Sequence, residues 1–380
     1  MKKVKLGDLG KIITGNTPSK KTLEFYDSND IPFIKPDDFK TIDEISSSKG
    51  NKNYVSENAR NSARIVPKNS VLVTCIGIIG KVMISESELS FNQQINAIVP
   101  NELILSKYLA YLLLYNKPKL DFISNAPVVP IINKTQFSEF EVTFHKDIDI
   151  QEKIIQNLEN LDNQILKRRH QSRLLLNLVK SRFNEMFGDD SNFEKVLLSS
   201  VCDVRDGTHD SPKYVKKGFP LITSKNVTNG VIDFNNTNYI SQLDFEKINQ
   251  RSKVDYGDIL LPMIGTIGNP VVVDTRRMFA IKNVALIKFY NESTVHNIYI
   301  KNLLTSFYFD KQVLQKIRGG TQKFIALRDI RGFQIPLPPL SLQNEFADFV
   351  GQVDKSQLAI QKSLEELETL KKSLMQEYFG

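Results

Sequence analysis

An internal repeat limits the possible folds of this chain more than any other feature of the sequence. Three segments of the first half recur in the same order in the second half, at spacings of 192 (195 − 3) or 188 (264 − 76) positions. The matched pairs are Lys3–Leu6 with Lys195–Leu198, Ile76–Gly80 with Ile264–Gly268, and Ser181–Gly188 with Ser373–Gly380. Such ordered matches indicate a duplication, so we predict two copies of one structural unit.

Within each copy, the apolar pattern predicts the same order of elements. A short strand is followed by a polar stretch, a β-rich run with a Gly-x-x-Gly, a helical segment and a proline-containing linker. In the first copy the strand, the β-rich run and the helical segment are Ile31–Ile34, Val71–Ile76 and Ser106–Tyr115. Their counterparts are Phe219–Ile222, Ile259–Ile264 and His296–Ile317. We therefore expect an α/β (α+β) domain in each copy.

The two Gly-x-x-Gly segments allow two interpretations. One is a nucleic-acid-binding Gly-x-x-Gly loop, but that motif lies between helices. Here the segments lie between predicted strands, at Gly77–Gly80 and Gly265–Gly268. Glycines between strands more simply supply the positive φ angles of a hairpin turn, and we favour this interpretation.

After each linker the apolar residues change to a spacing of three and four, which predicts a long helix with a coiled-coil seam. We expect Asp149 and Glu152 to form a capping box on the first helix and Ser341 to cap the second. Gly188 and Gly380 should follow the helix ends. The predicted seams are Ile154, Leu158, Leu161, Ile165, Leu175, Val179 and Met186, and then Phe346, Val350, Val353, Ile360, Leu364, Leu367, Leu374 and Tyr378.

A long helix with one apolar stripe must pair, and we predict that the two helices pair with each other in an antiparallel coiled coil. Parallel pairing is the alternative. Polar residues within the seams, such as Ser172 and Lys371, are typical of positions that fix register. The predicted boundaries are 1–148 for the first domain, 149–188 for the first helix, 189–340 for the second domain and 341–380 for the second helix.

Composition restricts the location of the protein more than its activity. The formal charge of +7 and the pI near 9.0 permit nucleic-acid binding without requiring it. The longest apolar run, Tyr108–Tyr115, is far shorter than a membrane span, and we expect a cytoplasmic protein with no membrane partner. Cys75 and Cys202 are the only cysteines and do not occupy matched positions, so we expect two buried thiols rather than a disulfide or a metal site.

Several motifs resemble one known family, the specificity subunits of type I restriction–modification enzymes. The resemblance covers essentially the whole chain. The segments that carry it are Leu6–Leu9, Thr14–Ser19 and its counterpart Asp206–Pro212, Gly319–Ile325, and Ile335–Leu340 leading into Gln343. The first copy departs from the pattern, since Ser124–Val129 replaces the Gly-Gly-Thr-Gln segment. An equivalent contact there is therefore not implied.

The resemblance implies two target-recognition domains that each read half of a split double-stranded DNA sequence. It also implies that the two long helices hold these domains apart in a pseudo-twofold arrangement. The implied partners are two methyltransferase subunits and two restriction and translocation subunits. These partners would bring S-adenosylmethionine, ATP and magnesium, and no cofactor is implied for this chain.

The sequence lacks the motifs of a catalytic centre. Leu337–Leu340 contains two prolines but neither the Asn or Asp nor the aromatic residue of an adenine-N6 methyltransferase motif, and it is typical of a stiff linker. We find no phosphate-binding Gly-x-x-x-x-Gly-Lys loop, nuclease cluster or catalytic triad. We therefore predict no catalytic residue and no metal ligand, with catalysis supplied by the partners.

The candidate DNA contacts lie in polar loops that differ between the two copies. Lysines suit phosphates, whereas amide side chains such as Asn226 and Gln322 suit adenine and Lys225 suits guanine. We expect His209 to be a local hydrogen-bond partner rather than an acid or base. The candidates are Thr17, Lys20, Lys21, Lys35 and Asp38 in the first copy, and Thr208, His209, Lys213, Ser224, Lys225, Asn226, Thr321, Gln322 and Lys323 in the second.

Two other functions compete with DNA recognition. A self-sufficient methyltransferase or nuclease would contain the motifs that are missing here. A purely architectural spacer would not need two domains of about 150 residues, the size of an independent domain. The predicted function is therefore a non-catalytic specificity subunit that directs its partners to a bipartite, asymmetric DNA site.

Overall fold

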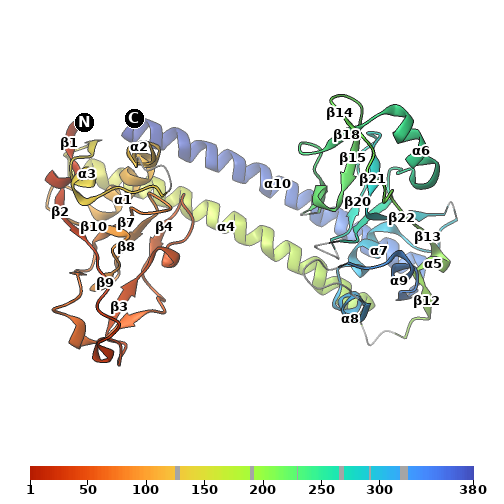
Figure 1. The fold of residues 1–380 in the computed structure, drawn as a ribbon, viewed down its shortest axis with the longest axis horizontal. Helices are drawn as coiled ribbons and strands as arrows, with labels where there is room; N and C mark the ends of the chain where they lie inside the picture. The colour runs from red at the N-terminus through yellow and green to blue at the C-terminus, as the bar shows by residue number, and fades with distance from the viewer. Residues whose placement is uncertain (125–128, 189–191, 229, 265–268, 291, 317–323) are drawn as a thin grey trace. The chain divides into compact units, whose positions relative to one another are not determined.

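The computed structural model describes all residues except 125–128, 189–191, 229, 265–268, 291 and 317–323 (Figure 1). It divides into two compact units. Unit 1 consists of Met1–Arg169 and Ser363–Gly380, and unit 2 consists of His170–Lys362. Each unit therefore contains one mixed α/β domain together with segments of both long helices.

Among its described residues, the domain of unit 1 contains three sheets and three short α-helices. The two-stranded sheet pairs β1 (Lys2–Lys5) with β11 (Glu141–Phe144). The five-stranded sheet has the order β2 (Gly10–Thr14), β10 (Ile95–Pro100), β7 (Val71–Thr74), β8 (Val82–Ile84), β4 (Ile45–Ser47). The four-stranded sheet has the order β5 (Tyr54–Val55), β3 (Ile31–Ile34), β9 (Leu89–Phe91), β6 (Ile65–Val66). The helices are α1 (Ser106–Tyr115), α2 (Lys117–Ile123) and α3 (Lys134–Ser138).

The domain of unit 2 repeats this plan. One two-stranded sheet pairs β12 (Lys195–Leu197) with β23 (Gln334–Pro336), and another pairs β16 (Val227–Thr228) with β17 (Val231–Ile232). The first four-stranded sheet has the order β13 (Cys202–Asp206), β22 (Val284–Phe289), β19 (Ile259–Pro262), β20 (Val271–Val272). The second has the order β14 (Tyr214–Val215), β18 (Asn238–Ile240), β15 (Phe219–Thr223), β21 (Ala280–Lys282). Its helices are α5 (Leu198–Val201), α6 (Gln242–Ser252), α7 (Asn297–Leu303), α8 (Phe307–Lys316) and α9 (Leu327–Arg331). The parallel pair β15–β21 matches the parallel pair β3–β9, which confirms the duplication.

The first Gly-x-x-Gly segment connects two antiparallel strands, as predicted. Val73 of β7 pairs with Val82 of β8. Between these strands Gly77 has a φ of 79° and Gly80 a φ of 81°. Both angles lie in the left-handed region, which glycine adopts without the clash that a Cβ would cause. The turn interpretation is confirmed for this copy, whereas Gly265–Gly268 lie outside the described residues.

Two 40-residue helices follow the domains, α4 (Ile148–Phe187) and α10 (Leu340–Phe379). The predicted ends are confirmed, but both predicted caps are wrong. The Asp147 carboxylate accepts the backbone N–H of Asp149 at 2.9 Å, so the cap lies two residues before the expected one. At α10 the Pro339 carbonyl accepts the backbone N–H of Leu342 at 3.0 Å, which places Ser341 inside the first turn.

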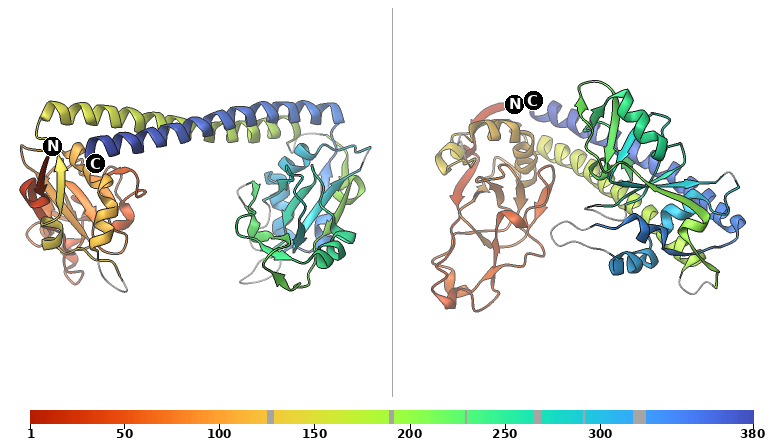
Figure 2. Two further views of the ribbon diagram at one scale, coloured as in Figure 1. Left: turned by 90° about the horizontal axis from the view of Figure 1, so that it is seen from above. Right: turned by 45° about the vertical axis from the view of Figure 1, so that its right-hand side comes forward.

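Within each unit the segments of α4 and α10 run antiparallel, which confirms the predicted pairing (Figure 2). In unit 1, Asn157 contacts Tyr378 at 3.0 Å and Asp162 contacts Lys371 at 2.6 Å. In unit 2, Ser172 contacts Gln357 at 2.8 Å and Arg182 contacts Glu345 at 2.9 Å. In each unit residue numbers rise along one helix as they fall along the other. The buried seam residues include Ile154, Leu158, Leu161, Ile165, Phe346, Val350 and Val353.

A buried glutamine in the first turn of each long helix joins the helix to its domain. The side-chain amide of Gln151 donates to the carbonyls of Leu103 and His145, and its oxygen accepts the N–H of Leu105 at 2.9 Å. Gln343 makes the same three kinds of bond in unit 2, with Thr294, Pro338 and His296. These two glutamine clamps fix the direction in which each domain meets its helix.

The two cysteines are buried, as predicted, and burial raises the pKa of each thiol to about 12. Among the described residues, no helix is both long enough and apolar enough to cross a membrane.

Candidate nucleic-acid interface

In unit 2, three of the predicted contact residues converge on Asn283. The ring Nδ1 of His209 lies 2.8 Å from the Asn283 side-chain oxygen. The Ser224 hydroxyl donates to the Asn283 carbonyl at 3.1 Å, and the Asn283 N–H donates to the Thr208 carbonyl at 3.2 Å. Asn283 has a φ of 54°, a left-handed conformation that asparagine tolerates better than most residues. Asn283 therefore joins the loop after β13 to the turn after β15, although it lies more than 50 positions from both in the sequence.

In each unit a glycine brings the loop close to a neighbouring backbone segment, which is β21 in unit 2 and the end of β9 in unit 1. A Cβ at Gly207 would overlap the carbonyl oxygen of Ile281, and a Cβ at Gly15 would overlap that of Asn92. Only glycine permits so close an approach. After Gly15, the Thr17 hydroxyl donates to the side-chain oxygen of Gln93 at 2.9 Å. The two loops thus share a backbone path but present a threonine in one unit and a histidine in the other.

Two predicted contacts belong to the internal structure of their loops. Asn226 is buried: its side-chain oxygen accepts the N–H and the hydroxyl of Thr223, and its NH₂ donates to the carbonyls of Asp233 and Asn236. All four hydrogen-bonding positions of the amide are occupied, so the expectation that Asn226 pairs with adenine is wrong. At the matched position of unit 1, the Asp38 carboxylate accepts the N–H of Lys35 at 2.7 Å and caps the same short turn.

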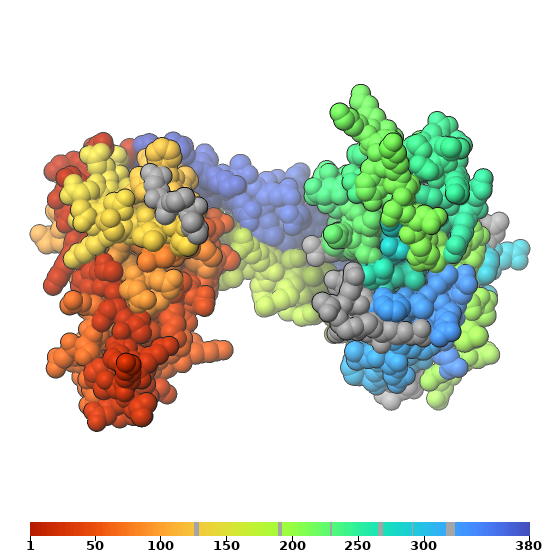
Figure 3. All heavy atoms as spheres, viewed as in Figure 1, coloured from red at the N-terminus to blue at the C-terminus, as the bar shows by residue number. Residues whose placement is uncertain are grey.

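The predicted lysine contacts are mostly exposed. Lys20, Lys21, Lys213 and Lys225 all lie on the surface. Lys213 directly precedes β14, a segment that projects from the surface of unit 2 (Figure 3). Lys35 is only half exposed, because its ammonium group donates to the Asn53 side chain at 2.7 Å. Lys35 therefore stabilises its own loop, while the exposed lysines are available to phosphates.

Two charged residues near His209 were not among the predicted contacts. Asp206 at the end of β13 is buried, and its carboxylate contacts His209 Nε2 at 2.8 Å and also the guanidinium of Arg251. Both ring nitrogens of His209 are therefore engaged, which confirms the expected local hydrogen-bond role. Arg251 lies in the last turn of α6 and comes to Asp206 from a separation of 45 residues. No local motif indicates such a contact.

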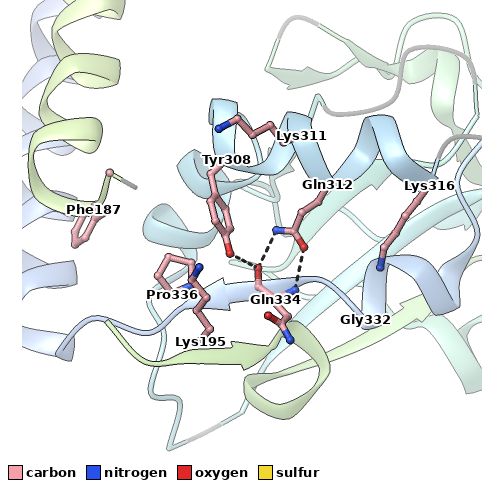
Figure 4. A pocket seen from close by; sticks show the side chains of 10 residues that line it. Phe187, Lys195, Tyr308, Lys311, Gln312, Lys316, Gly332, Gln334 and Pro336 are labelled. Atoms are coloured by element: carbon pink, nitrogen blue, oxygen red, sulfur yellow. Dashed lines mark hydrogen bonds between the residues drawn. The ribbon is translucent and has the colours of Figure 1, made fainter. Parts of the chain in front are cut away.

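A hollow of about 640 Å³ on unit 2 lies along α8 (Figure 4). Its lining includes Lys195, Lys311 and Lys316. The side chains of Tyr308 and Gln312 both donate to the carbonyl of Gln334, at 3.1 and 2.9 Å. Helix α8 ends at Lys316, directly before the segment that contains the predicted contacts Thr321, Gln322 and Lys323, and these three residues lie outside the described residues.

A family model described as "Type I restriction modification DNA specificity domain" matches residues 1–174 and 190–370. The chain therefore belongs to this family. A type I restriction enzyme specificity subunit, MjaIX of Methanocaldococcus jannaschii, is 25% identical over 98% of this chain and 90% of its own length. The HindI specificity subunit of Haemophilus influenzae is 35% identical over 43% of this chain and 37% of its own length.

Solved structures share the fold. The S subunit of a type I restriction–modification system from M. genitalium superimposes with a TM-score of 0.58 at 13% identity, covering 100% of this chain and 96% of that one. A chain from a study of complex assembly and conformational transition in the type I system gives a TM-score of 0.61 at 14% identity, covering 99% and 97%. The predicted fold, two α/β domains with long antiparallel helices, is thereby confirmed.

Among the described residues, no group of three or more His, Cys, Asp or Glu side chains is arranged to hold a metal ion. The polar residues at the candidate interface bond to neighbouring backbone and side-chain groups, as the contacts of His209 and Asn226 show. The arrangement is suited to holding exposed loop residues in fixed positions against a ligand.

Proposed function

We propose that this protein is the DNA sequence-specificity subunit of a type I restriction–modification complex. Residues 1–148 and 189–340 would each be a target-recognition domain that reads one half of a bipartite site in double-stranded DNA. The observation that carries this proposal is the duplicated loop after β2 and β13. In both units a glycine brings this loop close to a neighbouring backbone segment, but two residues later the loop has Thr17 in unit 1 and His209 in unit 2. A shared scaffold with different polar side chains is what two unlike half-sites require.

Exposed leucines on the long helices support the proposal of partner subunits. On α4, Leu166 in unit 1 and Leu174 and Leu178 in unit 2 expose between 47 and 66% of their surface. Apolar groups along a solvent-exposed helix favour binding to a further protein surface. We propose two methyltransferase subunits and two restriction and translocation subunits as partners in the cytoplasm. S-adenosylmethionine, ATP and magnesium would act in those partners, and this chain would be non-catalytic.

The decisive experiment is methylation mapping of a genome in cells that express this chain with its partner methyltransferase. We expect methylated adenines at one split, asymmetric sequence. Replacing residues 195–335 with the corresponding stretch of the first copy should convert that site to a palindrome. A native site that is already palindromic would contradict the assignment of unlike half-sites, and turnover or S-adenosylmethionine binding by the pure chain would contradict the non-catalytic role.

We further propose that α4 and α10 set the length of the unread spacer between the half-sites. A matched insertion of seven residues after Arg169 and Gln361 preserves the heptad phase and adds about 10.5 Å, or about three base pairs of DNA. The mapped spacer should lengthen while both half-sites stay the same. A four-residue insertion slips the seam and should impair the protein. An active heptad variant with an unaltered spacer would exclude the helices as the ruler.

A further inference from the structure

Asp206, the last residue of β13, has a buried carboxylate. Asp206 is only 4% exposed, although an ionised carboxylate is costly to bury unless it is paired and hydrogen-bonded. Its two oxygens contact Arg251 and His209. Both partners are themselves exposed, with 63% of the Arg251 side chain and 60% of the His209 side chain accessible to solvent. The carboxylate therefore holds two surface side chains from a fixed position beneath them.

Arg251 is both restrained and accessible. One nitrogen of its guanidinium contacts Asp206, and its backbone carbonyl accepts a hydrogen bond from the Arg205 side chain at 3.1 Å. A guanidinium has five N–H donors, so most of them stay available after the contact with Asp206. An arginine that is already held in place loses less side-chain entropy when it binds a ligand. This arrangement suits a recognition residue better than a freely moving surface arginine.

Unit 1 has a neutral counterpart. Thr14 directly precedes Gly15 as Asp206 precedes Gly207, and the Thr14 hydroxyl donates to the Asn96 side chain at 2.6 Å. A short turn, Glu57–Ala59, follows β5 where the longer α6 follows β18. The shared fold therefore does not require a buried charge at this position. The Asp206–Arg251 pair is present in the second domain, whereas the first domain has Thr14 at the matched position. Such a difference is expected of residues that serve only one half-site.

We propose that Arg251 contacts DNA in the second recognition domain and that Asp206 is its positioning residue. The ligand is a pair of acceptor atoms matched to the guanidinium fork, either guanine O6 and N7 or two phosphate oxygens. This inference rests on the proposed DNA-specificity function. It adds a contact on α6 to the loop residues that the sequence indicated.

The test uses the full chain with its partner methyltransferase and a duplex that carries the mapped site. Arg251→Ala, Asp206→Asn and the double variant are compared with Lys253→Ala. Lys253 is a matched control because it removes the same charge two residues away, from an ion pair with the exposed Asp255. Affinity is measured over a range of salt concentrations, sites are mapped by methylation, and melting temperatures monitor folding.

We expect Arg251→Ala to weaken binding roughly tenfold to a hundredfold, and Lys253→Ala to leave it unchanged. A relaxed base preference at one position of the second half-site identifies guanine as the ligand, whereas a uniform loss with a salt slope smaller by about one identifies phosphate. The effects of Asp206→Asn and Arg251→Ala should not be additive in the double variant, because the carboxylate positions the arginine. Any further loss in the double variant reports on His209, the other partner of the carboxylate.

Unchanged affinity, salt slope and site in Arg251→Ala would overturn the inference while leaving the proposed function intact. Arg251→Ala alters an exposed side chain, so this result can be obtained even if Asp206→Asn does not fold. If the wild-type complex yields no sequence-specific methylation, the proposed function fails and the inference fails with it.

Discussion

The junctions between helix and domain in unit 1 and unit 2 keep the same polar contacts but differ in their apolar packing. In both units a buried tyrosine meets the last phenylalanine of a long helix edge to face: Tyr108 with Phe379 at 5.2 Å and Tyr299 with Phe187 at 4.9 Å. Around this pair, unit 2 uses the phenylalanines 183 and 346 where the repeat places Met375 and Ile154 in unit 1. The duplicated frame therefore preserves directional contacts and allows the apolar core to be repacked.

The helix seams, in contrast, differ in their polar contacts. In unit 1 the Asp162 carboxylate accepts hydrogen bonds from Lys371 at 2.6 Å and from the Tyr111 hydroxyl at 2.7 Å. In unit 2 the half-buried polar pair is neutral, because Ser172 and Gln357 exchange hydrogen bonds, and the charged pair Arg182–Glu345 is more exposed.

The largest effect is expected from the aromatic core of unit 2. Phe346 is fully buried against Phe183 and Phe187. Phe346→Ala should lower the free energy of unfolding by about 3–5 kcal/mol, because it removes transfer energy and leaves a cavity. Hydrogen exchange followed by mass spectrometry should locate the loss of protection in unit 2. Ile154→Ala is the matched change in unit 1, and loss of protection in unit 1 from Phe346→Ala would contradict the separation of the two cores.

The glutamine clamps should show equal effects in the two units. Gln151→Ala or Gln343→Ala leaves buried backbone groups without partners, at a cost of about 1–3 kcal/mol each. Urea unfolding of the two variants should give similar losses. Clearly unequal losses would show that the clamps are not equivalent despite their matched contacts.

The sequence predicted the repeated frame but not the contacts across it. The spacing of apolar residues such as Leu158 and Val350 determined the helices, since a 3.6-residue period is visible in any helix with one buried face. The start of α10 could not be read in this way, because the helix begins directly after Pro339, whose carbonyl accepts its first backbone hydrogen bonds. Asn226 is buried, and a polar residue that follows a strand does not reveal its burial in the local sequence. Arg251 and Asn283 were missed because their partners lie 45 and 74 residues away.

The start of α7 in the second domain is capped by a histidine, so we expect its stability to depend on pH more than that of the matched start of α1. His296 accepts the N–H of Ile298 through its ring Nδ1 at 3.1 Å, and burial lowers the pKa of His296. The neutral ring is the acceptor, so its contribution of about 1 kcal/mol is present above the unfolded-state pKa near 6.5. It is lost as pH falls through the lower folded-state pKa.

The matched helix start in unit 1 is Leu105, which has no side-chain cap. His296→Asn should keep a cap while removing this part of the pH dependence, as measured by unfolding at several pH values between 7 and 5 (roughly the range in which histidine titrates). An unchanged pH dependence in this variant would show that another group is responsible.

The smallest effect is expected at the charged seam of unit 1. Lys371 is mostly buried, but the Asp162 side chain is 35% exposed, so solvent screens the pair. Lys371→Met should change stability by less than about 1 kcal/mol and should reduce the response of unit 1 to added salt. Unfolding in low and high NaCl measures both. A salt response that stays the same in Lys371→Met would exclude this ion pair as its source.

Each unit contains segments of both long helices, and this has a consequence for genetic recombination. Each domain packs against the beginning of its own helix and the end of the other, as the contacts of Tyr108 with Phe379 and of Tyr299 with Phe187 show. A genetic crossover at the edge of a domain would separate it from the phenylalanine that it needs. A pair of crossovers within the helices, near residues 169 and 362, would move a domain together with everything it packs against. New DNA specificities should therefore spread most readily through exchanges that break inside the helices.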